Sequence, residues 1–293
     1  PQTYIETLPA SRGSKSCNVR PRVLKMRMRR DGISARVPLG RHTERQPVIT
    51  PPHDHRPLVL GHRGASAHAG DNTIEAFELA VAQGADGVEL DVRFTADGHV
   101  VLHHDPTVGE MGPLVHHDFE TLRSSHPEIP TLDEALDVLV DLTVNVEIKN
   151  SPSEPDYDPN HKMAAAIAHW VARHDIYERV IVTSFNSETA AVVRDSDPVI
   201  TTGQLTPAGF DIAGGVDSIA AAGHSWIAPW VGDATAGAET VIAATHDAGL
   251  KMAVWTVDDP SQIEILATAG ADALISNDPA ATLRIIGRFQ EPS

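Results

Sequence analysis

Four charged residues lie at alternate positions in two apolar segments, and their types and spacing could support chemistry. Glu89 and Asp91 are two residues apart in GVELDV, and Glu147 and Lys149 are two residues apart in NVEIKN. Side chains two residues apart in a β-strand point to the same side. If both segments are strands of one parallel sheet, we expect three carboxylates and one ammonium group to converge.

Such a carboxylate cluster has two physical interpretations. Carboxylates that share a cleft of low dielectric cannot all stay ionised without a compensating cation, so either their pKa values rise or a divalent metal binds. Oxygen ligands alone favour Mg²⁺ or Ca²⁺ over zinc. The alternative is a buried salt-bridge network in which Lys149 pairs with Glu147 or Asp91. The carboxylates by themselves do not decide between these two structures.

Histidines supply candidates for proton transfer. His62 and Arg63 follow the apolar segment PLVLG, and His103 and His104 close the short segment GHVVLHH. Two histidines at the rim that receives the carboxylates would form a general acid and base pair, because an unperturbed imidazole titrates near neutral pH. Alternation along a strand does not decide whether His103 or His104 faces the site.

The elements that must position these residues follow a β/α pattern. From Pro57 onward, short apolar segments alternate with amphipathic ones, which is typical of β/α units around a parallel sheet. We expect strands at 57–62, 86–92, 143–149, 179–185, 199–205, 225–230, 251–257 and 271–277, with a shorter one at 98–104. Helical patterns include 72–83, 161–174, 238–249 and 260–270. Eight units predict a (β/α)₈ barrel, whose sites form at the C-terminal ends of the strands. A doubly wound open sheet is the alternative, because periodicity does not show closure.

Charge divides the chain into two parts. Residues 1–57 carry a net positive charge while the whole chain carries −17, so the remainder is strongly acidic. We predict a poorly ordered extension over 1–56 and one domain over 57–293. An acidic surface repels nucleic acid and anionic membranes, so an anionic substrate needs a local cation. No apolar run predicts stable membrane insertion and no secretory signal is visible, so we expect a cytoplasmic location. No oligomeric state is predicted.

An ordered series of motifs resembles the glycerophosphodiester phosphodiesterase family. HRGA, DNT, ELDV, DG and HHDPT are followed by VEIK, VTSF, VWTVDD and ISNDPA, and the resemblance runs from about Pro57 to Arg288. It implies a (β/α)₈ barrel and one divalent cation, Mg²⁺ or Ca²⁺. It also implies metal-dependent hydrolysis of a small-molecule glycerophosphodiester, such as glycerophosphocholine or glycerophosphoethanolamine, to sn-glycerol 3-phosphate and an alcohol.

The resemblance implies a role for each matching residue. The implied metal ligands are Glu89, Asp91 and Glu147. The implied catalytic histidines are His62 and His104, the second because it directly precedes the aspartate of an HD motif. The implied substrate-binding residues are Arg63 and Lys149, which would contact the phosphate, and Trp255, which would wall the pocket.

Two departures from the family pattern concern the site. Asp71 stands where the family usually has glutamate, so the acidic group is one methylene shorter and its contacts are in question. The insertion between His104 and the helical pattern at 131–139 is short, so we expect no long cap over the site.

Two alternative functions share this constellation. One is a lysophospholipase D type activity, in which the glycerol keeps an acyl chain, and the other is a non-catalytic barrel that binds a phosphate ligand. The apolar rim candidates for an acyl chain are Phe185, Trp226, Trp230 and Trp255, although an aromatic residue near a barrel strand is more often part of the core.

Overall fold

A computed structural model describes residues 56–287 of the chain. The predicted extension over 1–56 lies outside the described residues except for Arg56, and so do residues 288–293. Arg56 forms two hydrogen bonds with the Asp86 carboxylate, at 2.7 and 2.8 Å. This ion pair joins the start of the described chain to the residue that precedes the second strand. The boundary at 56/57 and the single domain over 57–293 stay predictions.

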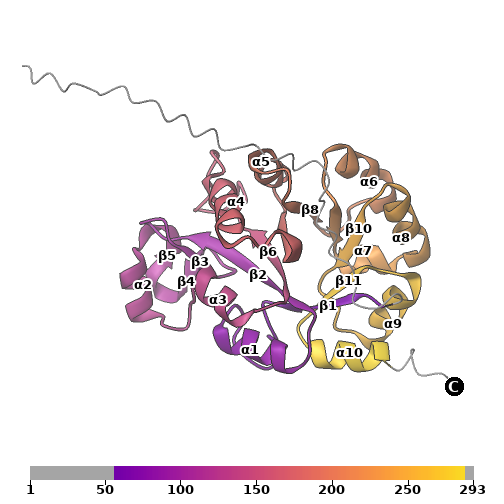
Figure 1. Cartoon of the computed structure of the whole chain (residues 1–293), viewed down its shortest axis with the longest axis horizontal. Helices are drawn as coiled ribbons and strands as arrows, with labels where there is room; N and C mark the ends of the chain where they lie inside the picture. The colour runs from indigo at the N-terminus through magenta and orange to yellow at the C-terminus, as the bar shows by residue number, and fades with distance from the viewer. Residues whose placement is uncertain (1–55, 288–293) are drawn as a thin grey trace, which may run out of the picture. The chain divides into compact units, whose positions relative to one another are not determined.

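Eight parallel strands close into a barrel (Figure 1). They are β1 (Leu58–His62), β2 (Gly87–Phe94), β6 (Thr143–Ile148), β7 (Val180–Ser184), β8 (Thr201–Thr206), β9 (Trp226–Pro229), β10 (Lys251–Val254) and β11 (Ala273–Ser276). β1 pairs with β2 on one side and with β11 on the other. This double pairing confirms the (β/α)₈ barrel and excludes the open sheet. Each strand overlaps the segment predicted for it.

Helices connect successive strands along the chain. They are α1 (Ile74–Ala82), α3 (Leu132–Val138), α4 (Lys162–His174), α5 (Ser187–Ser196), α6 (Ile212–Ala221), α7 (Val231–Thr235), α8 (Ala238–Asp247), α9 (Pro260–Ala269) and α10 (Pro279–Gly287). Several begin at capping residues: the side chains of Thr73, Asn186 and Asp259 accept hydrogen bonds from backbone N–H groups of the first turn. These caps set where each helix starts and hence the length of the loop before it. Within the described residues no helix is both long and apolar enough to cross a bilayer.

The hydrophobic core lies inside and outside the barrel wall. Outward side chains such as Val59, Val88 and Leu90 pack in the clusters that include the helices. Inward side chains, among them Leu60, Ile181 and Ile275, form a separate cluster in the barrel interior. Apolar side chains therefore close the interior, while the strand ends above it carry the polar residues.

Trp226 belongs to this interior cluster and is 2% exposed. It is the first residue of β9, so its side chain lies at the end of the strand away from the C-terminal rim. Of the two roles considered for Trp226, the structure therefore supports the core role and not the rim role, because a bulky residue at a strand start fills the barrel.

A short insertion follows β2, as predicted. It comprises β3 (Val100–Leu102), which pairs antiparallel with β2, the small hairpin β4 (Thr107–Val108) and β5 (Gly112–Pro113), and α2 (Phe119–Ser125). Val101, Leu114 and Leu122 belong to a small hydrophobic cluster of its own. The insertion thus packs around itself.

Replacing Trp226 with alanine should test its place in the core. We expect Trp226→Ala to lower the free energy of unfolding by about 3–5 kcal/mol, because it leaves a cavity in the barrel interior. The control is Trp230→Ala, since Trp230 is 38% exposed, and its loss should cost less than about 1 kcal/mol. Urea denaturation followed by far-UV circular dichroism measures both, and equal losses would contradict the core assignment.

Candidate active site

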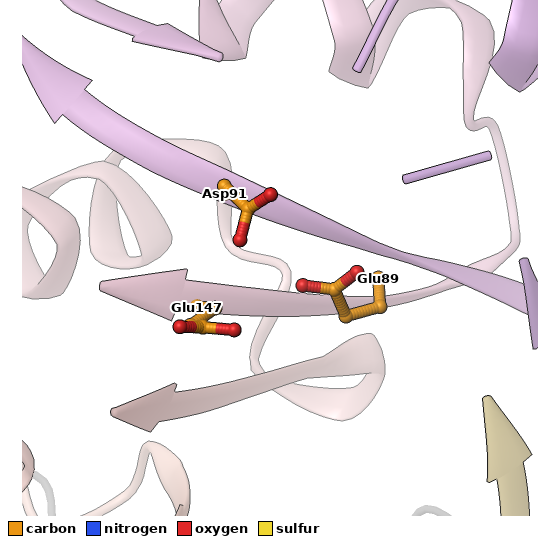
Figure 2. Close-up of side chains that lie close together, drawn as sticks. All are labelled: Glu89, Asp91 and Glu147. Atoms are coloured by element: carbon orange, nitrogen blue, oxygen red, sulfur yellow. The ribbon is translucent and has the colours of Figure 1, made fainter. Parts of the chain in front are cut away.

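Three buried carboxylates meet where the C-terminal ends of β2 and β6 lie side by side. Glu89 and Asp91 come from β2, and Glu147 from β6 pairs with Asp91 in the sheet register. Figure 2 shows the three carboxylates gathered between the two strands. A ligand oxygen from each lies within 4.8 Å of the others, and Glu89 is only 3% exposed. The structure therefore brings all three predicted metal ligands together.

Two cations contact the carboxylate cluster. The Lys149 ammonium lies 2.5 Å from Glu147 Oε1 and 2.9 Å from Asp91 Oδ1. Arg63 Nε lies 3.1 Å from Asp91 Oδ2. The salt-bridge network that competed with the metal interpretation is therefore present, since Lys149 pairs with both Glu147 and Asp91.

The network leaves Glu89 incompletely satisfied. Its Oε2 accepts a hydrogen bond from the Arg63 backbone N–H at 3.1 Å, but Oε1 is buried with no hydrogen-bond partner. Two cations also face three carboxylates, so one negative charge is in excess if all are ionised. A buried oxygen without a partner beside an excess negative charge fits a divalent cation bound by oxygen ligands.

Protonation of the cluster reflects the same imbalance. Burial and the nearby Asp91 carboxylate raise the pKa of Glu89 well above its usual range, and burial also raises the pKa of Glu147. At Asp91, burial is outweighed by the charges of Lys149 and Arg63, which lower its pKa to about 2. The metal-free cluster thus relieves its repulsion by favouring a proton on Glu89.

A chain of hydrogen bonds orients His62. Its Nδ1 lies 2.7 Å from Asn277 Oδ1, while Asn277 Nδ2 donates to Asp258 Oδ2 at 2.5 Å. The bond to Asp258 sets which end of the Asn277 amide faces the ring, so His62 Nδ1 must carry the hydrogen. The other ring nitrogen, Nε2, then presents a lone pair 4.0 Å from Glu89 Oε2. Burial and the Arg63 charge lower the pKa of His62, which favours the neutral imidazole.

His104 is a histidine whose surroundings include charged residues of the site. Burial and the Lys149 ammonium lower its pKa, while the Asp91 carboxylate opposes this shift, so both charges act on the imidazole. His104 Nδ1 lies 2.7 Å from Asp105 Oδ1. The ring of His103 instead bonds to the Asp105 backbone carbonyl, through Nδ1 at 2.8 Å. The two histidines therefore differ in their surroundings, and the assignment of His104 as the catalytic one stays a prediction.

The DNT segment secures both Arg63 and Asp91. Arg63 Nη1 donates to Asp71 Oδ2 at 3.1 Å, so the shorter acidic residue still contacts the arginine. Asn72 Nδ2 donates to Asp91 Oδ2 at 2.8 Å, and the Asp91 backbone N–H donates to Asn72 Oδ1. Arg63 has a φ of 57° and Gly64 a φ of 88°, so this turn passes through the left-handed region immediately after β1.

Aromatic residues occupy the strand ends away from the carboxylates. Trp255 follows β10, and its Nε1 donates to the Ala228 carbonyl at 2.9 Å. Phe185 packs edge-on against Trp255 with ring centroids 5.4 Å apart, and Phe185 is 40% exposed. The rim is therefore charged at β1, β2 and β6 and largely apolar at β7 and β10.

Sequence reasoning missed four residues that support the site: Asn72, Arg93, Asp258 and Asn277. Asn277 and Asp258 lie in quoted motifs, ISNDPA and VWTVDD. Asp258 bonds to Asn277, and the other side-chain partners of Asn277, His62 and Ser66, come from the opposite end of the described chain. Arg93 continues the alternation of Glu89 and Asp91 along β2, and this pattern could have indicated it.

The sequence matches the Glycerophosphoryl diester phosphodiesterase family over residues 62–281. It is 30% identical over 259 residues to a glycerophosphodiester phosphodiesterase of Caldanaerobacter subterraneus, covering 78% of this chain and 97% of that protein. A glycerophosphodiester phosphodiesterase of Bacillus altitudinis is 29% identical over 250 residues, with the same two coverages of 78% and 97%.

Solved structures share the fold. A putative glycerophosphoryl diester phosphodiesterase from Silicibacter pomeroyi is 25% identical, with a TM-score of 0.68 over 81% of this chain and 95% of that one. An Oleispira antarctica phosphodiesterase, solved in complex with the product sn-glycerol-3-phosphate, is 23% identical, with a TM-score of 0.67 over 79% and 97% of the two chains.

Fold, carboxylate cluster and relatives together define a phosphodiesterase built on a TIM barrel. More specifically, the chain belongs to the glycerophosphoryl diester phosphodiesterase family, and its enzyme class is that of the glycerophosphodiester phosphodiesterases.

Metal binding should release a proton from the cluster. Because the pKa of Glu89 is raised in the metal-free protein, this proton must leave before the carboxylate can bind a cation. We therefore expect the affinity for Mg²⁺ or Ca²⁺ to fall as pH falls and binding to be accompanied by proton release. Calorimetric titration in buffers of different ionisation enthalpy measures both quantities.

Matched variants locate the released proton. Glu89→Gln should abolish the release and weaken binding, whereas Glu239→Gln, at an exposed position on α8, should change neither. Binding that is independent of pH between 5 and 8, with no proton released, would contradict the raised pKa of Glu89.

Proposed function

We propose that the protein hydrolyses glycerophosphodiesters, such as glycerophosphocholine or glycerophosphoethanolamine, to sn-glycerol 3-phosphate and an alcohol, with one Mg²⁺ or Ca²⁺ ion. The observation that carries this proposal is the buried cluster of Glu89, Asp91 and Glu147 with a free carboxylate oxygen, flanked by two histidines. When bound, the ion would polarise a phosphoryl oxygen and offset its developing charge.

Two side chains would bind the anionic part of the substrate. Arg63 offers a guanidinium that pairs with phosphate oxygens in two directions, and Lys149 offers a compact positive charge. The protein as a whole carries −17, so these cations and the ion provide the local attraction that a phosphodiester requires. Trp255 would form the apolar wall beside them.

The hydrogen-bond partners of the two histidines support different roles. His62 is held by a neutral amide with the Nε2 lone pair directed toward the cluster, which suits a general base that takes a proton from the nucleophile. His104 Nδ1 is paired with the Asp105 carboxylate, which partly offsets the lowering of the His104 pKa by burial and Lys149 and would stabilise the imidazolium that a general acid for the leaving alkoxide requires. Each role would contribute roughly 10²- to 10⁴-fold in rate.

Release of sn-glycerol 3-phosphate from each diester tests the proposal. With Mg²⁺ or Ca²⁺, wild-type protein should turn over substrate, and a chelator should stop it. Glu89→Gln and His104→Ala should each lose at least about 10²-fold in kcat, because they remove a metal ligand and a proton-transfer group. His99→Ala, at a half-exposed histidine of the insertion, is the matched control and should keep full activity.

Several outcomes would count against the proposal. Folded wild-type protein that binds phosphate but shows no turnover with any metal or diester would support the phosphate-binding barrel instead. Full turnover in the presence of chelator would contradict the metal dependence alone.

A second candidate function, lysophospholipase D type hydrolysis, is favoured by a groove beside the aromatic rim. The groove measures about 500 Å³ and runs from Phe185 along α5 and α6, with Leu205, Phe210 and Ile219 among its apolar lining residues. Phe185 also contacts Trp255, so the groove begins at the rim of the site. An acyl chain left on the glycerol would fit this apolar surface.

Blocking the groove separates the two substrates. Ala222→Trp adds bulk to the groove lining without touching the charged site, so it should reduce turnover of lysophosphatidylcholine by about tenfold or more and leave glycerophosphocholine unchanged. Product analysis by mass spectrometry measures both. Equal rates for wild type and variant on the acylated substrate would remove the groove from consideration.

A further inference from the structure

Arg93 is a buried cation in the wall that carries the carboxylates. It follows Glu89 and Asp91 at alternate positions of β2 and is 1% exposed. Burial of a guanidinium is unfavourable unless its donors are satisfied, so its partners indicate why it is there.

The first partner is the backbone of a catalytic residue. Arg93 Nε and Nη2 donate to the His104 carbonyl oxygen at 2.9 and 2.6 Å. The backbone hydrogen bond from the His103 N–H to the Asp91 carbonyl lies just beyond the end of β3. Arg93 therefore continues the attachment of the segment to β2 at the residue that must hold the imidazole.

The second set of partners lies in the loop after β6. Arg93 Nη1 donates to Asp156 Oδ2 at 2.5 Å and to Glu154 Oε2 at 3.1 Å, and Nη2 also donates to Glu154 Oε2 at 3.1 Å. One planar guanidinium thus joins three segments of the rim: β2, the chain at His104, and the loop at 154–156. A lysine could not make this set of bonds, because its donors radiate from one atom.

The side-chain contact of His104 alone is a weak restraint. Its Nδ1 partner Asp105 is largely exposed, and the imidazole itself is 40% exposed. Hydrogen bonds at exposed sites compete with water, whereas the bonds from the buried Arg93 guanidinium do not. The position of the His104 backbone, and hence the direction of its ring, depends on Arg93.

We propose that Arg93, held by Glu154 and Asp156, is a positioning residue that aligns His104 for proton transfer. The inference rests on the proposed function, since it assigns Arg93 to the catalytic histidine of that reaction. Proton transfer requires the imidazole within hydrogen-bond distance of the reacting oxygen, so a displaced backbone lowers kcat more than it changes KM.

A double-mutant cycle tests this assignment on the metal-loaded full-length protein. Arg93→Gln should lower kcat for glycerophosphocholine by about 10- to 100-fold with KM within about threefold, and His104→Ala should lower it further. In the double variant, the loss should equal that of His104→Ala alone, because groups that act as one unit are not additive. Independent, multiplicative losses would overturn the proposal.

A diester with a p-nitrophenol leaving group provides a second readout. It needs little protonation on departure, so if His104 is the acid, both Arg93→Gln and His104→Ala should approach wild-type rates on it. A purely structural defect in Arg93→Gln would lower the rates of hydrolysis of both substrates by the same factor. Whichever role His104 has, the two variants should respond alike to the leaving group, and a divergence would count against the inference.

A matched arginine controls for loss of buried hydrogen bonds. Arg179 Nη1 donates to the Leu139 and Leu142 carbonyls at 2.6 and 3.1 Å, away from the C-terminal rim. Arg179→Gln should lower the melting temperature without changing kcat. If Arg93→Gln does not fold, Asp156→Asn is the substitute variant. It weakens one contact that holds the Arg93 guanidinium, while the bonds from Arg93 to the His104 carbonyl remain.

Amide hydrogen exchange distinguishes failure of the inference from failure of the proposed function. Exchange at residues 103–105 should be at least about tenfold faster in Arg93→Gln than in wild type or Arg179→Gln. Unchanged exchange overturns the inference even if the enzyme is active. Wild-type protein without turnover, but with the expected exchange difference, rejects the proposed reaction and leaves the positioning of His104 by Arg93 supported.

Discussion

Mutual repulsion of three carboxylates in a dry barrel mouth is the constraint on which the site depends. Water screens such charges poorly there, so each must find a cation, a donor or a proton. Lys149 and Arg63 flank Asp91, Asn72 donates to it, and Glu89 retains a free oxygen. The site consequently leaves one negative charge uncompensated if all three carboxylates are ionised, which is compatible with the divalent ion of the proposed function.

The strand pairing of the closed barrel fixes the positions of the charged residues relative to one another. The sheet register sets His62 beside Glu89 and Asp91 beside Glu147, so residues far apart in the sequence share one level of the wall. Beneath them, apolar side chains such as Leu60 and Trp226 fill the interior. The polar side chains at the strand ends lie on this closely packed apolar interior, so they have few alternative conformations.

The periodicity of the sequence predicted most of the fold and part of the site. Alternate spacing placed Glu89 with Asp91, and the count of β/α units predicted the barrel, because both depend on local repeats. Bonds between distant segments were not predictable: His62 meets Asn277 because β1 pairs with β11, and Arg93 meets Asp156 because β2 pairs with β6. The pattern alone could not decide the place of Trp226, because an aromatic residue near a strand end can lie in the barrel interior or at the rim.

The rim carries charged side chains at β1, β2 and β6 and the apolar contact of Phe185 with Trp255 at β7 and β10. In the proposed function, bond cleavage and phosphate binding would belong to the charged side. Substitutions that are well separated and share no partners tend to act additively. β7 pairs directly with β6, whereas β10 pairs only with β9 and β11, so substitutions at Trp255 after β10 could change the substrate preference with less effect on the charged residues than substitutions at Phe185.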